Sequence, residues 1–120
     1  MAERAKVPYI YQIDFDDVAS GSTSYQSPAI QVGSRPFVMT HIAAYSEGDQ
    51  DFSFLIKDDT VTQQFMNARV FHKAISKTGT RPFELPVPWR FEANSTIYAE
   101  AKNEGTSTDT LHILLIGYLE

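Results

Sequence analysis

Apolar and polar side chains alternate with a period of two along most of this chain. In residues 9–17 four apolar side chains share one face: Tyr9, Tyr11, Ile13 and Phe15. The same alternation recurs in residues 51–59 and 95–103. Successive side chains of a β-strand point to opposite faces, so this period is typical of strands with one buried face. The pattern predicts an all-β protein whose sheets enclose the core.

Turn-forming residues (Gly, Ser, Asn and Asp) divide the pattern into short segments. The expected strands are residues 9–17, 30–32, 36–45, 51–59, 95–103 and 110–120, with the proline-rich residues 81–91 between them. Residues 20–29 fit either a polar loop or a short strand, and residues 67–76 fit either a strand or a helix. Such spacing predicts an antiparallel β-sandwich of seven to eight strands. Residues 36–45 and 110–120 are apolar on both faces, which indicates strands covered on both sides.

Residues 60–76 fit either a helix or a strand. Val61, Phe65 and Met66 have helical spacing, which favours one short helix near 60–68. Residues 67–76 include β-branched and aromatic side chains that favour a strand.

A chain of 120 residues is long enough for one domain with a substantial core. We expect a single sandwich domain over residues 9–120. Residues 1–8 are polar and end in Pro8, so they are expected to form an N-terminal arm. Such an arm either frays or reaches a neighbouring subunit.

The composition excludes several classes of partner and site. The formal charge is −5, with 10 basic and 15 acidic residues, which argues against a nucleic-acid partner. No apolar stretch is long enough to span a membrane, and the start has no apolar segment like that of a signal peptide. The absence of cysteine excludes disulfides and thiolate metal sites. We expect a protein made in the cytoplasm that binds neither nucleic acid nor membrane.

The stretch "RPFELPVPWRF", residues 81–91, combines prolines with aromatic side chains. Proline cannot sit inside a helix or donate to a β-ladder, which leaves an extended crossover or an edge strand. Five apolar side chains would project to one side: Phe83, Leu85, Val87, Trp89 and Phe91. They are either buried within their own domain or left partly open to anchor a partner. The candidate partner-binding residues are Trp89, Arg90 and Phe91 at the contact, with Phe83 and Val87 beneath them.

The C-terminal part of the chain resembles small β-sandwich proteins that decorate or cement the capsids of tailed bacteriophages. The resemblance rests on an "F-x-L-P-x-P" stretch, an "N-S-T-I" strand, a following Asn and a terminal Gly-Tyr. The matching positions here are Phe83, Leu85, Pro86, Pro88, Asn94, Ser95, Thr96, Ile97, Asn103, Gly117 and Tyr118. It implies a jelly-roll or related sandwich that binds the major capsid protein as a homo-oligomer, a dimer or trimer, on the capsid surface of the virion.

No catalytic, metal or cofactor site is expected. The three histidines His41, His72 and His112 lack the His-x-His spacing by which cupin-type sandwiches bind metal, and structural roles are favoured. His41 and His112 fall in strands expected to be buried, where they could meet across the sheets. Carboxylates are dense only in residues 47–51, which suit a solvated turn better than a calcium loop. No Gly-x-Ser-x-Gly motif occurs.

The leading hypothesis is therefore a non-enzymatic capsid decoration or cement subunit. One alternative is a carbohydrate- or receptor-binding module that uses exposed aromatic side chains, Trp89 among them. Others are a tail or baseplate component of the virion and a small cupin-type enzyme.

Overall fold

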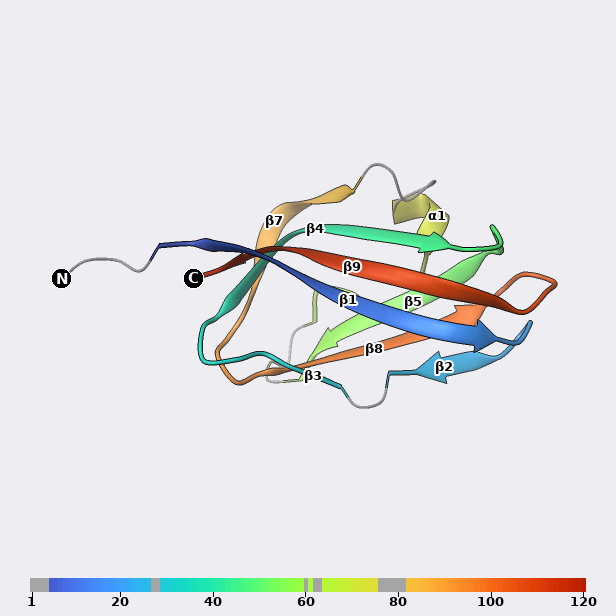
Figure 1. The fold of residues 1–120 in the computed structure, drawn as a ribbon, viewed down its shortest axis with the longest axis horizontal. Coiled ribbons are helices and arrows are strands. Elements are labelled where there is room, and N and C mark those ends of the chain that lie inside the picture. Colours follow the sequence, from blue (N-terminus) through green and yellow to red (C-terminus); the bar gives the residue numbers. More distant parts are fainter. Residues whose placement is uncertain (1–4, 27–28, 60, 62–63, 76–81) are drawn as a thin grey trace.

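The computed structural model describes residues 5–26, 29–59, 61, 64–75 and 82–120 (Figure 1). The elements are β1 (Val7–Val18), β2 (Thr23–Tyr25), β3 (Ile30–Gln31), β4 (Phe37–Ser46), β5 (Phe52–Asp58), β6 (Val70–Phe71), α1 (His72–Ile75), β7 (Phe83–Phe91), β8 (Thr96–Asn103) and β9 (Asp109–Leu119). Within these residues no helix is long and apolar enough to cross a membrane.

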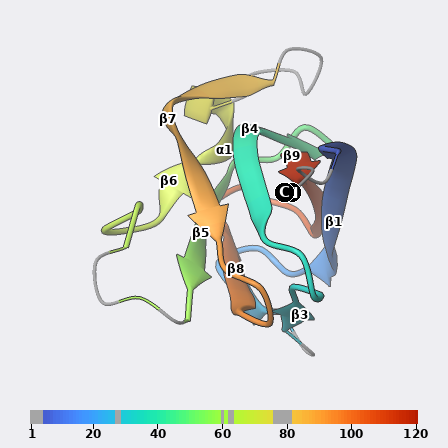
Figure 2. The same cartoon turned by 90° about the vertical axis from the view of Figure 1, so that its left-hand side faces the viewer.

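The strands form two antiparallel sheets that pack face to face (Figure 2). The first has the order β1-β9-β4-β7, and the second has the order β2-β8-β5-β6. β3 also pairs with β8, so β2 and β3 share one edge position. Most connections cross from one sheet to the other, and this order is that of a jelly roll. The predicted antiparallel sandwich is confirmed.

The core lies between the sheets and is supplied by alternate positions of the strands. Its fully buried apolar side chains include Ile13, Phe37, Met39, Phe52, Phe54, Ile56, Ile97, Leu111, Ile113 and Leu115. Phe54 and Ile56 of β5 lie opposite Ala101 and Ala99 of β8. The small alanines leave room for their large neighbours, which gives the close packing expected of a protein interior.

The two strands that are apolar on both faces differ in their surroundings. In β4 the outward Val38 and Ala43 are buried but Tyr45 on the same face is exposed, so the expectation that residues 36–45 are covered on both sides holds only in part. In β9 the outward Leu114 and Ile116 are only half-buried, so the expectation that both faces of residues 110–120 are covered is wrong.

The short helix is displaced from its expected position. It comprises His72–Ile75, whereas residues 61 and 64–68 are not helical, and residues 60, 62 and 63 lie outside the described residues. The Gln64 side chain donates to the carbonyls of Asp58 and Val61, and these two hydrogen bonds hold Gln64 against the end of β5. Phe65 and Met66 pack on the core from the loop, which explains their apolar character.

The strand β1 begins inside the expected arm. Val7 and Pro8 pair with Leu119 and Tyr118 of β9. The Lys6 ammonium lies 4.8 Å from the centre of the Tyr118 ring. The strand pairing thus takes in two residues of the expected arm, residues 1–4 lie outside the described residues, and the division into an arm and a domain stays a prediction.

Candidate functional site

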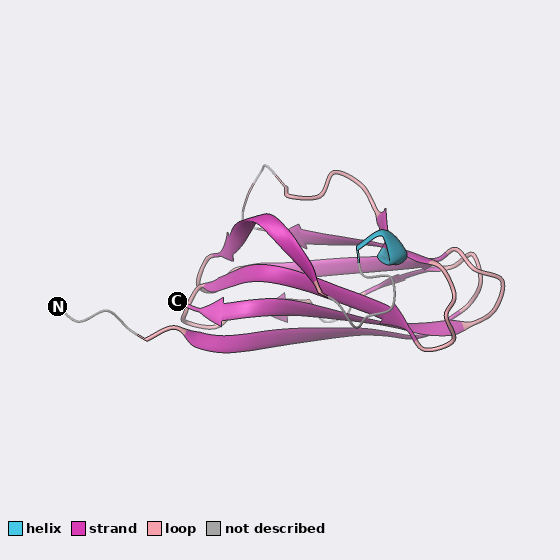
Figure 3. Ribbon diagram, turned by 90° about the horizontal axis from the view of Figure 1, so that it is seen from above, coloured by secondary structure: helices cyan, strands magenta, loops and turns pink. Residues whose placement is uncertain are grey.

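The proline-rich stretch forms β7, an edge strand of the first sheet (Figure 3). β7 pairs with β4 at both ends, where Trp89 lies opposite Met39 and Glu84 lies opposite His41. Residues 85–88 have no ladder partners and bulge opposite Thr40. We call residues 85–88 the β7 bulge. Proline has no N–H to donate, so a bulge on an edge strand accommodates Pro86 and Pro88 without loss of a ladder hydrogen bond.

The C-terminal end of β7 is anchored in the core. Phe91 is 0% exposed and stacks on Phe37 at 6.2 Å between ring centres. Trp89 is half-buried, and its ring lies 4.9 Å from that of Phe65. The Trp89 Nε1 donates a 3.1 Å hydrogen bond to Oδ2 of Asp58, which is fully buried at the end of β5. These contacts hold the base of the bulge against the other sheet.

The outward part of β7 is the bulge itself. Val87 is 77% exposed, and Pro86 and Pro88 on either side of it are exposed as well. Arg90 is exposed and forms ion pairs with Glu92 at 2.5 Å and with Glu120 at 3.4 Å. Phe83 is half-buried. Phe91 thus lies inside and Val87 outside, the opposite of the order expected for these two residues, whereas Arg90 is exposed as expected. The partner-binding role of these residues stays a prediction.

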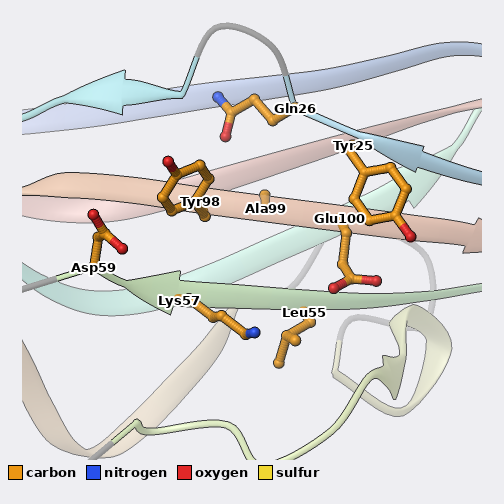
Figure 4. Close-up of a pocket in the computed structure, with 8 residues that line it drawn as sticks. All are labelled: Tyr25, Gln26, Leu55, Lys57, Asp59, Tyr98, Ala99 and Glu100. Atoms are coloured by element: carbon orange, nitrogen blue, oxygen red, sulfur yellow. The ribbon is translucent and has the colours of Figure 1, made fainter. Parts of the chain in front are cut away.

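A second feature is a cleft on the outer face of the other sheet (Figure 4). It has a volume of about 350 Å³, and its lining side chains come from β2, β5 and β8 and from the residues that directly follow β2 and β5, Gln26 and Asp59. The sequence pattern places Tyr98 and Glu100 outward on their strand, in agreement with the structure. Tyr25 and Gln26 lie in residues 20–29, which suit either a polar loop or a short strand, so the pattern carries no signal for the cleft as a whole.

His112 is the centre of an ionic cluster on the outer face of the first sheet. Its Nδ1 lies 2.5 Å from Oδ1 of Asp14, and its Nε2 lies 3.3 Å from Oε1 of Glu47. The Tyr45 ring covers the imidazole at 5.0 Å. Partial burial opposes protonation, but the hydrogen bonds that the imidazole donates to the two carboxylates raise the pKa of His112 above 6.5. Hydrogen bonds from Gln12 and His112 lower the pKa of Asp14.

The other two histidines are separate from this cluster. His41 lies on β4 of the same sheet as His112, so the two do not meet across the sheets as expected. His72 is buried, and its Nδ1 accepts a 3.1 Å hydrogen bond from the backbone N–H of Phe52. Burial lowers the pKa of His72 and favours the neutral ring that can accept this bond.

The acidic turn is neutralised from within the chain. The Lys73 ammonium lies 3.3 Å from Asp49 and 3.1 Å from Asp51. Among the described residues, no group of three His, Asp or Glu side chains could hold a metal ion.

Comparisons with known proteins identify one solved structure with a similar fold. No protein-family model matches the sequence, and no curated protein matches it. Among solved structures, a chain of the "Acidic stable capsid structure of Helicobacter pylori bacteriophage KHP30" superposes with a TM-score of 0.58 at 13% sequence identity. The likeness covers 95% of this chain and 88% of that one. It is a likeness of fold.

Proposed function

We propose that this chain is a structural protein of a bacteriophage virion, without enzymatic activity. It acts as a decoration or cement subunit that binds the major capsid protein lattice and stabilises the head. The observation that carries the proposal is the nearly full-length likeness of fold to a chain of a phage capsid structure. The C-terminal sequence pattern that includes Pro86, Pro88 and Asn94 supports it independently. The protein is made in the host cytoplasm and is displayed on the capsid surface.

The β7 bulge is the proposed docking element. Val87 presents an apolar side chain to solvent between two prolines, and Arg90 supplies a charged rim. Proline restricts the backbone before binding, so docking costs little conformational entropy. Trp89 and Phe91 keep the bulge in place from below rather than contacting the partner.

The small size of the bulge favours an oligomer. A stable interface buries at least about 1,200 Å² in total, which a prominence of four residues cannot supply alone. A homo-oligomer, a dimer or trimer, would engage several lattice sites at once and gain avidity without new contacts.

Co-sedimentation with empty heads tests the proposal. The heads are assembled from the major capsid protein encoded in the same genome and are mixed with the purified chain. Saturable binding in a fixed ratio to the capsid protein is expected. Val87→Asp places a charge at the apex and should lower the affinity at least tenfold. Val61→Asp, at an exposed valine in another loop, is the matched control and should bind normally.

Two results would contradict the proposal. One is a monodisperse monomer that does not bind heads at any concentration tested. The other is exclusive labelling of tails when antibody against the chain is applied to intact particles, which would favour the tail or baseplate alternative.

A further inference from the structure

The outer face of the β2-β8-β5 sheet carries two solvent-exposed tyrosines beside a cleft. Tyr25 is 68% exposed and Tyr98 is 45% exposed. Figure 4 shows them on either side of Ala99, with Gln26 along one margin and Leu55 and Lys57 along the other. We propose that this cleft binds a neutral saccharide. The proposal does not depend on the virion role.

The strand register sets the spacing of these groups. Tyr25 of β2 and Leu55 of β5 both lie opposite Glu100 of β8, in one row across the sheet. Tyr98 lies opposite Lys57 in the adjacent part of the sheet. The aromatic rings thus come from two different strands, and polar groups lie between and beside them. Because regular pairing fixes the backbone, the site is largely preformed.

The size and chemistry of the cleft suit a sugar. Its volume of about 350 Å³ is near the lower end of the roughly 300–1,000 Å³ typical of ligand pockets. A pyranose ring has an apolar C–H face that packs against tyrosine and a rim of hydroxyls that exchange hydrogen bonds. Lys57 can donate to such hydroxyls, and Asp59 and Glu100 can accept from them.

The charges of the site favour a ligand without net charge. Two carboxylates, Asp59 and Glu100, are balanced by two cations, Lys57 in the cleft and Arg69 beside it. Arg69 forms a 3.0 Å ion pair with Glu100. An anionic ligand would be repelled by both carboxylates, and a cationic ligand would be repelled by Lys57. Neither would therefore gain electrostatic binding energy over a neutral ligand.

The side-chain oxygen of Gln26 can accept a hydrogen bond from a ligand. Its backbone N–H donates to the carbonyl of Ala99 at 2.9 Å, which holds the residue along the cleft. Its side-chain Oε1 is buried and has no hydrogen-bond partner within the described part of the chain. A buried unpaired acceptor is costly, and a sugar hydroxyl would satisfy it.

Trp89, in contrast, is not available as a sugar platform. Its indole N–H is bonded to Asp58 and its ring packs against Phe65. The aromatic side chains that line the proposed sugar site are instead Tyr25 and Tyr98 on the other sheet.

A glycan array of neutral, sialylated and sulfated oligosaccharides tests the inference with the full chain. Binding to neutral glycans is expected. Titration of the labelled protein with the strongest neutral binder should shift the backbone amide signals of residues 25, 26, 55–59 and 98–100. Tyr25→Ala and Tyr98→Ala should each weaken binding at least tenfold. Tyr45→Ala removes a tyrosine of similar exposure, 43%, from the other sheet and should leave binding unchanged.

The variants are first compared with the wild type by circular dichroism. Tyr25 lies on a short edge strand and is largely exposed, so its variant remains informative even if Tyr98→Ala fails to fold. The inference is overturned if no neutral glycan binds above background, if only sialylated or sulfated glycans bind, or if Tyr25→Ala binds as well as the wild type.

Discussion

The indole Nε1 of Trp89 donates a 3.1 Å hydrogen bond to the Oδ2 of Asp58, and this bond joins the two sheets of the sandwich. Trp89 lies on β7 at the edge of one sheet, and Asp58 ends β5 in the other. The bond lies at the base of the β7 bulge, so it couples the stability of the fold to the position of the proposed docking element.

Replacing Trp89 by Phe should destabilise the protein by about 1–3 kcal/mol. The ring contact with Phe65 is largely kept, but the buried Asp58 carboxylate loses the indole donor, and the loss of a hydrogen bond to a buried charged group is costly. Trp89 is the only tryptophan, so urea unfolding is followed by circular dichroism rather than fluorescence. Tyr98→Phe removes an exposed hydroxyl and should change the free energy of unfolding by less than about 0.5 kcal/mol. Equal effects of the two substitutions would show that the Trp89–Asp58 bond contributes nothing.

Phe91→Ala and Val87→Ala should have very different effects, although both residues belong to one alternating series. Phe91 is fully buried, so truncation should cost about 3–5 kcal/mol of unfolding free energy. Val87 is 77% exposed, and its truncation should cost less than about 0.5 kcal/mol. Chemical denaturation of both variants provides the comparison. A large loss for Val87→Ala would mean that the bulge packs inward in solution.

Gly117→Ala should disrupt the pairing of β4 with β9. A Cβ at this position would lie 1.8 Å from the backbone carbonyl oxygen of Val38, which cannot move without breaking the ladder. We expect a loss of about 3 kcal/mol or more, measured as a lower denaturation midpoint. Gly33→Ala is the matched control, because a Cβ there meets no atom within 4 Å. A stability of Gly117→Ala equal to that of Gly33→Ala would argue against the close approach of these strands.

The His112 cluster should stabilise the fold most at mildly acidic pH. The pKa of His112 is raised above 6.5, so the folded protein binds this proton more tightly than the unfolded chain. The stabilisation is fully present below about 6.5, the unfolded pKa, and is lost as the pH rises through the folded pKa. The pKa of Asp14 is lowered below 3.8, so its contribution is fully present above about 3.8 and is lost as the pH falls through the lower pKa of the folded state.

The measurement compares the wild type with His112→Gln by thermal unfolding between pH 4 and pH 9. The difference in unfolding free energy between the two proteins should be largest near pH 5–6 and should vanish in alkaline solution. It should be about 1 kcal/mol or less, because both carboxylates are partly exposed. The contribution of His72 to the pH dependence of stability has the opposite sign, because its lowered pKa costs stability as the pH falls. Since both proteins contain His72, the difference between the wild type and His112→Gln reports the contribution of His112 alone. Direct NMR titration should place His112 above and His72 below 6.5. A difference that grows with rising pH would contradict the assignment.

Much of the fold was predictable because it depends on local alternation. A strand with one buried face needs an apolar residue at every second position, and Ile13, Phe54 and Ile97 occupy such positions and lie in the core. The same reasoning placed Tyr98 and Glu100 outward. The short helix could not be located in this way, because side-chain hydrogen bonds from Gln64 and packing of Phe65 replace a helix where the apolar spacing alone suggested one.

The binding surfaces were decided by tertiary structure. Alternation places Val87 on the same side as Phe91, but the bulge opposite Thr40 sends Val87 into solvent and leaves Phe91 in the core. A bulge depends on the register with a partner strand that is distant in sequence, and one strand alone does not contain that information. The cleft likewise exists only because β8 brings Tyr25 and Leu55 to either side of Glu100. The sequence by itself determined that the chain forms layered sheets, whereas long-range pairing determined which side chains face a partner.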